Sequence, residues 1–275
     1  MRQEIEELSE AMVRHGYVAD RDIATAVHLA TRLRRPLLVE GEAGVGKTEI
    51  AKVMAALLDA ELIRLQCYEG LDVHTSLYEW NYQRQLLRIR MEESEAASPD
   101  DIEERIFSRD YLLERPLLRA ITRDRAPVLL IDEIDRADEE FEAFLLEVLS
   151  DFQVSIPELG TVSATERPYV VLTSNSTREL SDALRRRCLY LWIDYPSLEK
   201  ELAILRLRRG DLSPGLAAEI ARFVHRMREE DLFKTPGVAE TLDWAEALGE
   251  LGVEELESET VRATLGCLIK DRHDL

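Results

Sequence analysis

The chain has 275 residues, and its 35 basic and 55 acidic side chains give a formal net charge of −20 at pH 7. A hydrophobic fraction of 45% is normal for a globular core, so wholesale disorder is excluded, and no apolar run approaches the roughly 18 residues of a membrane-spanning helix. Three cysteines without CxxC spacing and an acidic N-terminus exclude a disulfide framework, a cysteine zinc site and a signal peptide, so we expect a cytoplasmic protein with no membrane span.

Residues 1–35 are predicted to form an N-terminal helical segment. Apolar side chains recur at helical spacing through its second half, and three arginines crowd its end, where positive charge suits the helix dipole. Pro36 ends this helix. The apolar positions are Ile23, Ala26, Val27, Ala30 and Leu33.

Between residues 36 and 196, short apolar runs alternate with helical patterns. This alternation predicts βαβ units and therefore a parallel sheet in an αβα sandwich. Another pair of runs, Phe152–Ile156 and the residues from Val162, flanks a break at Pro157 and is typical of a hairpin. The predicted strands are Leu37–Val39, Leu62–Cys67, Val128–Ile131, Tyr169–Thr173 and Leu189–Ile193, and the predicted helices are Thr48–Leu58, part of 68–90, Tyr111–Ile121 with Pro116 as a kink or start, and Glu139–Leu149.

The composition changes at two places. The stretch from Glu92 to Glu104 holds seven acids and no base, which is typical of a solvated loop. After Pro196 no further strand is predicted, and four helical patterns follow at about 197–209, 214–228, 237–248 and 257–268. We therefore expect an αβα nucleotide-binding core over 36–196 and a small all-α lid domain over 197–275.

Residues 41–48 carry the pattern G-x-x-x-x-G-K-[ST], the phosphate loop or Walker A motif, between an apolar strand and a helix. Glycines let the backbone curl so that N–H groups point at phosphate oxygens, and the following helix presents its positive end to the same anion. Lys47 is predicted to reach the β- and γ-phosphates, and Thr48 to bind Mg²⁺. The predicted ATP-binding residues are Gly41, Glu42, Ala43, Gly44, Val45, Gly46, Lys47 and Thr48.

A pair of acids, Asp132 and Glu133, follows the apolar run Val128–Ile131, as in a Walker B motif. Ligands of open α/β sheets bind at the carboxyl ends of the strands, which is where this pair falls. Asp132 is predicted to hold Mg²⁺, directly or through water, and Glu133 to polarise the attacking water as a general base. Alone, such a pair indicates only a solvated strand end, but with a phosphate loop upstream it indicates hydrolysis of the nucleotide.

Two further polar groups lie beside later strands. Asn175 closes the strand from Tyr169 and is a candidate for orienting the water or contacting the γ-phosphate, against the alternative of ordinary turn chemistry. The run Arg185–Arg187 precedes the last strand. It is either a solvated patch or the source of an arginine that stabilises charge on a neighbouring subunit's nucleotide.

This order of motifs resembles the AAA+ ATPases, and most closely the MoxR family. Longer stretches resemble its CoxD branch, which is linked to maturation of carbon monoxide dehydrogenase. The resemblance runs from about His15 to the end of the chain. The stretches that carry it are RLQCYEGLD, LYEWNYQ, LLIDEIDRADEEFEAFLLEVLSDFQV, VVLTSNSTRELSDALRRRCLYLWIDYPS and TPGVAETLDWAEAL.

The resemblance implies a five-stranded αβα core, a helical lid and a ring, usually hexameric, with ATP at the subunit interfaces. It implies that Asn175 is the sensor 1 residue and that Arg187, or less favourably Arg186, is the arginine finger. It also identifies the segment from Phe152 to Val162 as the hairpin before sensor 1. One departure concerns the lid, where many MoxR proteins carry a sensor 2 arginine and this chain has Gly237.

These features predict an ATPase that uses ATP and Mg²⁺ to remodel a protein client. The resemblance implies an adaptor with a von Willebrand factor A domain and a metalloenzyme client that needs cofactor insertion. The alternative is a nucleic-acid-directed AAA+ motor, such as the ATPase subunit of a restriction system. The net charge of −20 disfavours nucleic acid, because phosphate contacts are made mostly by Lys and Arg. A third alternative is a nucleotide-gated switch that binds a partner without remodelling it.

Overall fold

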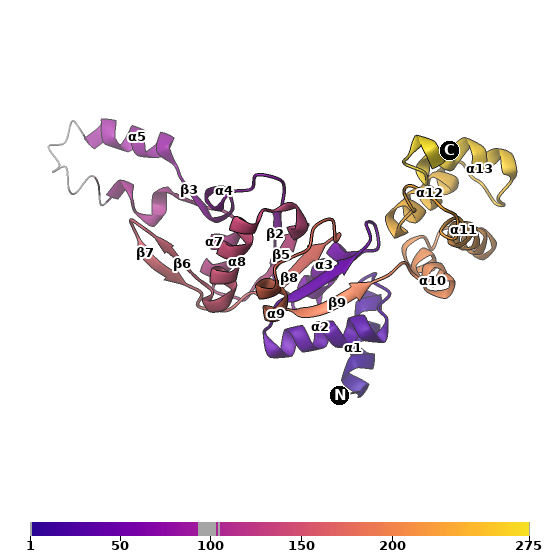
Figure 1. Ribbon diagram of the computed structural model, residues 1–275, viewed down its shortest axis with the longest axis horizontal. Helices are drawn as coiled ribbons and strands as arrows, with labels where there is room; N and C mark the ends of the chain where they lie inside the picture. Colours follow the sequence, from indigo (N-terminus) through magenta and orange to yellow (C-terminus); the bar gives the residue numbers. More distant parts are fainter. Residues whose placement is uncertain (1, 93–102, 104, 275) are drawn as a thin grey trace. The chain divides into compact units, whose positions relative to one another are not determined.

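The central element of the structure is a five-stranded parallel sheet (Figure 1). The computed structural model describes residues 2–92, 103 and 105–274. The sheet and the helices that follow it confirm the expected α/β P-loop architecture. Across the sheet the strands lie in the order β2 (Leu62–Gln66), β5 (Val128–Asp132), β8 (Tyr169–Ser174), β1 (Leu37–Gly41) and β9 (Leu189–Ile193).

The burial of each strand follows from its place in the sheet. Every residue of β1 and of β5 is buried, as expected of parallel strands that are covered on both faces. β2 is an edge strand and alternates, so Ile63 and Leu65 are buried whereas Arg64 between them is exposed. β1 and β5 also extend further than predicted, which makes Gly41 and Asp132 the last residues of their strands.

Helices connect these strands, and their ends carry the expected local signals. α8 begins after Asp138, whose side chain accepts a hydrogen bond from the backbone N–H of Phe141 at 2.8 Å, an ordinary N-cap. The helices that the structure describes before residue 196 are α1 (Arg2–Arg14), α2 (Arg21–Leu33), α3 (Lys47–Leu57), α4 (Val73–Leu77), α5 (Tyr82–Glu92), α7 (Pro116–Thr122), α8 (Glu139–Asp151) and α9 (Asp182–Arg187).

The helix predicted over Tyr111–Ile121 is wrong in its first half. Residues Leu112–Glu114 form β4, which pairs antiparallel with β3 (Tyr78–Trp80), and α7 begins at Pro116. Proline at the first helical position sacrifices no hydrogen bond, so Pro116 starts the helix rather than kinking it. Strands of three residues are too short to show a period of two, which is why the sequence did not indicate them. The acidic stretch predicted as a loop lies mostly outside the described residues.

The predicted hairpin is present as a two-stranded sheet. β6 (Gln153–Ile156) and β7 (Gly160–Ser163) pair antiparallel, with Val154 opposite Val162. Both valines are buried, and they pack into the same apolar cluster as β5 and α8. The hairpin is therefore anchored by one face, as the alternating pattern predicts.

Four helices follow β9 and gather into a group of their own, drawn from orange to yellow in Figure 1. Trp244 is fully buried at the centre of their apolar cluster. The last helix is shorter than predicted and continues as a 3₁₀ turn over Leu265–Cys267. These helices are α10 (Leu198–Arg208), α11 (Pro214–Met227), α12 (Val238–Glu250) and α13 (Ser258–Thr264).

A buried ion pair links three of these lid segments. The Arg228 guanidinium donates to both carboxylate oxygens of Glu201, at 2.6 and 2.7 Å, and Thr241 donates to the same carboxylate at 2.8 Å. Arg228 also donates to the Pro236 carbonyl at 2.8 Å. Glu201 is fully buried, so this bidentate pair is satisfied rather than solvated, and removal of one partner would leave an uncompensated charge.

The chain divides into two compact units, which we describe separately. The phosphate-loop unit comprises Met1–His28, Val39–Leu57 and Tyr190–Leu275, and the carboxylate unit comprises Leu29–Leu38 and Leu58–Leu189. The domain boundaries expected after residues 35 and 196 stay predictions. Within the described ranges, every helix is too short or too polar to traverse a lipid bilayer.

Candidate functional site

The phosphate loop joins β1 to α3 in the phosphate-loop unit. Lys47, the first residue of α3, is buried and turns back over the loop. Its Nζ donates to the carbonyl of Gly41 at 2.8 Å and to that of Glu42 at 2.5 Å. The ammonium group thus lies within the loop that it is predicted to serve, and the strand, turn and helix context of the motif is present.

Glycine is required in the loop by backbone conformation. Gly44 has a φ of +77° and Gly46 a φ of +94°, a region that residues with a side chain rarely adopt. These values allow successive N–H groups to face one side of the turn, which is how a phosphate cradle is built from main-chain atoms. Thr48 follows Lys47 on the first turn of α3 and is half-buried.

The lid touches this loop through a second glycine. Gly237 is the N-cap of α12, and the next residue but one, Ala239, donates its backbone N–H to the Gly44 carbonyl at 3.2 Å. A Cβ atom at Gly237 would lie 2.8 Å from both the Ala43 carbonyl oxygen and the Gly44 Cα. The start of α12 therefore rests on the phosphate-loop backbone only because residue 237 has no side chain. This explains physically why the position matched to a sensor 2 arginine holds glycine.

A pocket lies beside the phosphate loop in the same unit. Apolar side chains from the loop, from the chain after α1 and from the lid form its walls, among them Val18, Val45, Ile204 and Leu242. Tyr17 lines it as well, and burial raises the pKa of its phenol, with Asp20 and Glu49 adding to the shift. A concave apolar pocket next to a phosphate cradle is suited to a flat, uncharged ring system. The sequence did not indicate Tyr17 or Val18, because neither belongs to a recognisable motif.

The predicted Walker B acid is held in place within the carboxylate unit. Asp132 ends β5, and its side chain is only 3% exposed. Thr173 Oγ1, one residue before the end of β8, donates to Asp132 Oδ1 at 2.5 Å and accepts the backbone N–H of Glu133 at 3.0 Å. One buried hydroxyl therefore fixes both acids. Thr173 was predicted only as part of a strand end, and its contacts with both acids were not anticipated.

Glu133 has a left-handed backbone conformation, with φ +55° and ψ +50°. This conformation costs a non-glycine residue free energy, and residues that adopt it are concentrated at active sites. The side chain is 32% exposed, and its Oε2 lies 2.7 Å from Arg136 Nε. Arg136 therefore forms an ion pair with Glu133 of the same chain.

An arginine contacts Asp132 from the neighbouring strand. Arg64 of β2 donates to Asp132 Oδ2 through Nε at 3.0 Å and through Nη2 at 2.5 Å. Nη2 also donates to Gln66 Oε1 at 2.5 Å. This contact could not be anticipated from the sequence, because it depends on the register that places Gln66 opposite Asp132.

The remaining predicted residues, Asn175 and Arg187, come later in the carboxylate unit. Asn175 is half-buried and follows directly after β8. Arg187 is exposed at the end of α9, whereas Arg185 and Arg186 lie 3.9 Å from Glu179 and Asp182 respectively. Arg186 is exposed as well, with 83% of its side chain accessible, so exposure does not separate these two candidates for an arginine that reaches another molecule.

Each unit carries an oxygen donor of a kind that suits a magnesium ion. Thr48 supplies a hydroxyl and Asp132 a buried carboxylate, and Mg²⁺ prefers such hard oxygen ligands. The guanidinium of Arg64 already donates to Asp132 Oδ2, so this oxygen accepts a positively charged partner. A bound Mg²⁺ would supply charge neutralisation to the phosphates.

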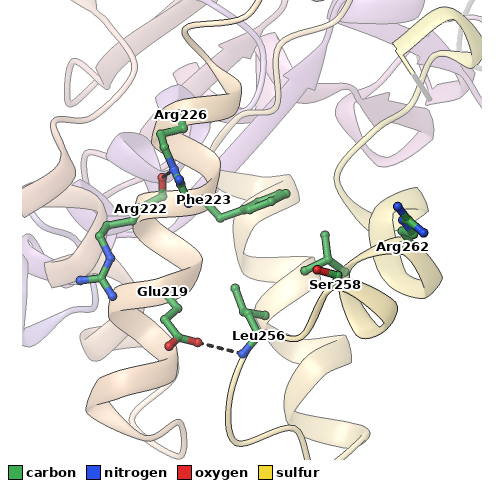
Figure 2. A pocket seen from close by; sticks show the side chains of 8 residues that line it. Glu219, Arg222, Phe223, Arg226, Leu256, Ser258 and Arg262 are labelled. Atoms are coloured by element: carbon green, nitrogen blue, oxygen red, sulfur yellow. Dashed lines mark hydrogen bonds between the residues drawn. The ribbon is translucent and has the colours of Figure 1, made fainter.

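The lid carries a separate hollow, shown in Figure 2, between α11 and the chain that enters α13. Glu219 and Phe223 extend from α11 toward the Leu256–Ser258 stretch, and Glu219 accepts the Leu256 N–H at 2.8 Å. Arg222 extends away from that stretch. The basic side chains around this hollow do not converge on one point, and none of the predicted site residues lines it.

A phosphate loop on an αβα sheet, with a buried Asp and an adjacent Glu at the end of a second strand, defines an AAA+ ATPase domain. The chain matches the family described as AAA domain (dynein-related subfamily) over residues 36–188, and it belongs to that family.

Solved structures of RuvB from Thermotoga maritima resemble more than nine tenths of the chain. One, described as a Holliday junction branch migration motor, is 20% identical, with a TM-score of 0.51 over 92% of this chain and 69% of that one. A proline-to-glycine variant is 19% identical, with a TM-score of 0.53 over 93% of this chain and 71% of that one. Likeness at this level of identity shows the shared fold.

Proposed function

We propose that this protein hydrolyses ATP in order to remodel a protein client, as a MoxR-type ATPase of the CoxD-like branch. The observation that carries the proposal is the pair of acids after β5. Asp132 is buried and fixed by Thr173, and the neighbouring Glu133 keeps a partly exposed carboxylate. A protein that only bound nucleotide would need the phosphate loop but not a second, accessible acid beside the first.

In this proposal the two units act on one ATP molecule. The loop N–H groups and Lys47 hold the phosphates, and Lys47 exchanges its present carbonyl partners for phosphate oxygens. Asp132 and Thr48 would hold Mg²⁺. Glu133 accepts a proton from the attacking water, and Asn175 orients that water. The apolar pocket lined by Tyr17 and Val18 receives the adenine ring.

Assembly supplies the last part of the site in this proposal. Arg187 is exposed, so it is available to a neighbouring copy rather than to its own nucleotide. An arginine supplied from a second molecule stabilises charge in the transition state and makes turnover depend on ring formation. We propose a ring, most simply a hexamer, that works with an adaptor containing a von Willebrand factor A domain on a metalloenzyme client.

Two measurements test the proposal. The first is Mg²⁺-dependent ATPase activity over a range of protein concentrations, which should rise per subunit as the ring assembles. The second is affinity capture with Glu133→Gln, held in ATP, followed by mass spectrometry. Lys47→Ala is the matched control, since it should not trap a nucleotide-dependent complex. Absence of ATPase activity at every concentration, with or without captured partners, would refute the function.

The second candidate is a nucleic-acid-directed motor. It is favoured by the likeness to RuvB, whose description names Holliday junction branch migration. It is disfavoured by the net charge of −20, which leaves little basic surface for phosphate contacts. ATPase activity that DNA stimulates, with a steep decrease as salt rises, would favour this motor over a protein remodeller.

A further inference from the structure

The hydrogen bonds from Arg64 to Asp132 bear on how the ATP site is regulated. We propose that Arg64 competes with magnesium for Asp132, so that the site is closed to the metal until Arg64 releases the carboxylate. This inference rests on the proposed ATPase function and concerns the regulation of the same site. Each step follows from contacts within the carboxylate unit.

The strand geometry brings Arg64 to the acid. β2 and β5 run parallel with Gln66 opposite Asp132, and residues two apart on a strand lie on the same face. Arg64 is therefore on the face of Gln66 and Asp132, while the buried Ile63 and Leu65 face the other way. Because β2 is the edge strand of the sheet, this face is open enough to leave the Arg64 side chain 53% exposed.

The two oxygens of Asp132 are held in different ways. Oδ1 is fixed by the buried Thr173 hydroxyl, which cannot move far without disturbing β8. Oδ2 is held by Arg64, a long side chain with access to solvent. In this proposal Thr173 orients the carboxylate, and Arg64 chiefly contributes charge.

Charge makes the two cations exclusive. A carboxylate buried as deeply as Asp132, with Glu133 next to it, needs a positive partner, and Arg64 supplies one. Two nitrogens of its guanidinium share the single oxygen Oδ2, at 3.0 and 2.5 Å. A second cation on that oxygen would lie within a few ångströms of the guanidinium, where like charges repel strongly. In this proposal Arg64 must release Asp132 before the carboxylate binds a metal ion.

Gln66 makes this release reversible. Its Oε1 accepts from Arg64 Nη2 at 2.5 Å, so the guanidinium has a neutral partner beside the acid. When the guanidinium gives up Asp132, it keeps this local hydrogen bond or turns into solvent, and the positive charge that the buried carboxylate loses would be replaced by Mg²⁺. The resting contact therefore lowers the apparent affinity for Mg²⁺ without blocking it.

The test measures nucleotide binding rather than turnover. A fluorescent ATP analogue is titrated into the full-length protein over a series of free Mg²⁺ concentrations and in EDTA, for wild type, Arg64→Gln and Arg64→Lys. If Arg64 occupies the acid most of the time, its removal should lower the half-saturating Mg²⁺ concentration roughly 3- to 10-fold, because apparent affinity scales with the competent fraction. Binding in EDTA should be unchanged, and Arg64→Lys should fall between the other two.

The matched control is Arg123→Gln. Arg123 is also a partly exposed arginine in an ion pair, with Glu61 at 2.7 Å, but that acid precedes β2 and lies outside the site. This variant should leave the Mg²⁺ dependence as in wild type. Thermal unfolding confirms that each variant is folded.

Two results would overturn the inference. An unchanged half-saturating Mg²⁺ concentration would show that the contact has no influence on the site, and an increased one would show that Arg64 positions Asp132 for the metal instead of competing with it. A failure of the ATPase proposal is distinguishable, since wild-type protein would then hydrolyse no ATP at any concentration, whereas the Mg²⁺ dependence of analogue binding would still report on Arg64.

Discussion

The two halves of the candidate site are built from different kinds of contact. In the phosphate-loop unit nearly every relevant contact uses the backbone: Lys47 donates to two loop carbonyls, and Ala239 of the lid donates to the Gly44 carbonyl. In the carboxylate unit the contacts are between side chains, with Thr173 and Arg64 on opposite oxygens of Asp132. Main-chain contacts suit a nucleotide that must be held, and side-chain contacts suit groups that must change partners during turnover.

This contrast makes a general prediction. Changes to the carboxylate-unit residues proposed to act on hydrolysis should reduce turnover while ATP affinity stays the same, whereas Arg64 should change only the Mg²⁺ dependence of binding. Changes in the phosphate-loop unit should reduce affinity first. A variant that reduces transition-state stabilisation alone lowers kcat, whereas one that removes uniform binding raises KM. The following variants test this division, beginning with the largest expected effect.

Arg187→Ala should have the largest effect on turnover. Loss of an arginine supplied in trans typically lowers kcat by about 10³- to 10⁵-fold, and in the proposed ring Arg187 would act on the nucleotide of the neighbouring subunit. ATP affinity should therefore be unchanged. The check is steady-state ATPase activity together with equilibrium binding. Arg186→Ala is the neighbouring control and should have a small effect. If Arg186→Ala were the inactive variant, the finger would be assigned to Arg186.

Glu133→Gln should follow, with turnover reduced by about 10²- to 10⁴-fold, the usual contribution of a general base. The amide keeps the shape of the side chain, and the backbone N–H of residue 133 still donates to Thr173, so the acid pair stays in place. ATP binding should match wild type. Single-turnover hydrolysis measures the chemical step directly, and normal hydrolysis by this variant would exclude Glu133 as the base.

Gly237→Ala tests the backbone contact of the phosphate-loop unit. The added Cβ would lie 2.8 Å from the Gly44 Cα, so α12 must shift away from the loop. Overpacking of this kind costs about 1–3 kcal/mol, and we expect ATP affinity to fall about 10-fold together with some stability. Isothermal titration with ATP measures the first and urea unfolding the second.

Gly215→Ala is the matched control in the same group of helices. Its Cβ would meet only Ser213 Oγ at 3.9 Å, an ordinary contact. It should leave ATP affinity unchanged and stability equal or slightly higher, because alanine favours a helix over glycine by roughly 1 kcal/mol or less. Equal affinities for the two variants would mean that the lid contact does not support the phosphate loop.

The same contrast decides how much of the site could be read from the sequence. The phosphate loop was predictable because its residues are consecutive and its glycines are demanded by backbone angles, as the φ of +77° at Gly44 shows. The acids after β5 were predictable as the end of an apolar strand. Arg64 was not, because its contact with Asp132 joins residues 68 positions apart through the register of two strands.

The fold shows the same limit. The ends of elements with long apolar patterns, such as β5, α11 and α12, were predicted to within a few residues of their observed bounds. The pair β3–β4 was missed, since each strand has three residues and Trp80 is buried by a tertiary contact with Phe107 rather than by a local pattern. The lid contact at Gly237 was visible only as a departure from a family pattern, and its cause needed the 2.8 Å approach to the loop.

Thr173→Val should have a smaller effect within the carboxylate unit. Valine keeps the shape but removes the donor to Asp132 Oδ1 and the acceptor of the Glu133 N–H. An unsatisfied buried group costs about 1–3 kcal/mol of unfolding free energy, and turnover should fall about 10-fold with ATP affinity retained. Thr161→Val, on an exposed position of the hairpin, is the control and should change neither quantity. Loss of ATP affinity in Thr173→Val would contradict the division between the units.

The smallest expected effect is on stability alone and comes from two thiols of the carboxylate unit. Burial raises the pKa of Cys67 and of Cys188 to about 12, and for Cys67 the charge of Asp132 adds to the shift. In the unfolded chain both thiols ionise near pH 9, so above that pH the folded state binds protons that the unfolded state has lost. The free energy of unfolding that these groups contribute is fully present below pH 9. Above that pH it decreases by about 1.4 kcal/mol for each pH unit and each thiol. Urea midpoints between pH 8 and roughly 10 measure this slope, and Cys188→Ala should make it shallower.

Iodoacetamide should modify the partly exposed Cys267 of the phosphate-loop unit first. Equal reactivity of the three thiols in the folded protein would show that the carboxylate unit opens far more readily than its buried hydrogen bonds imply.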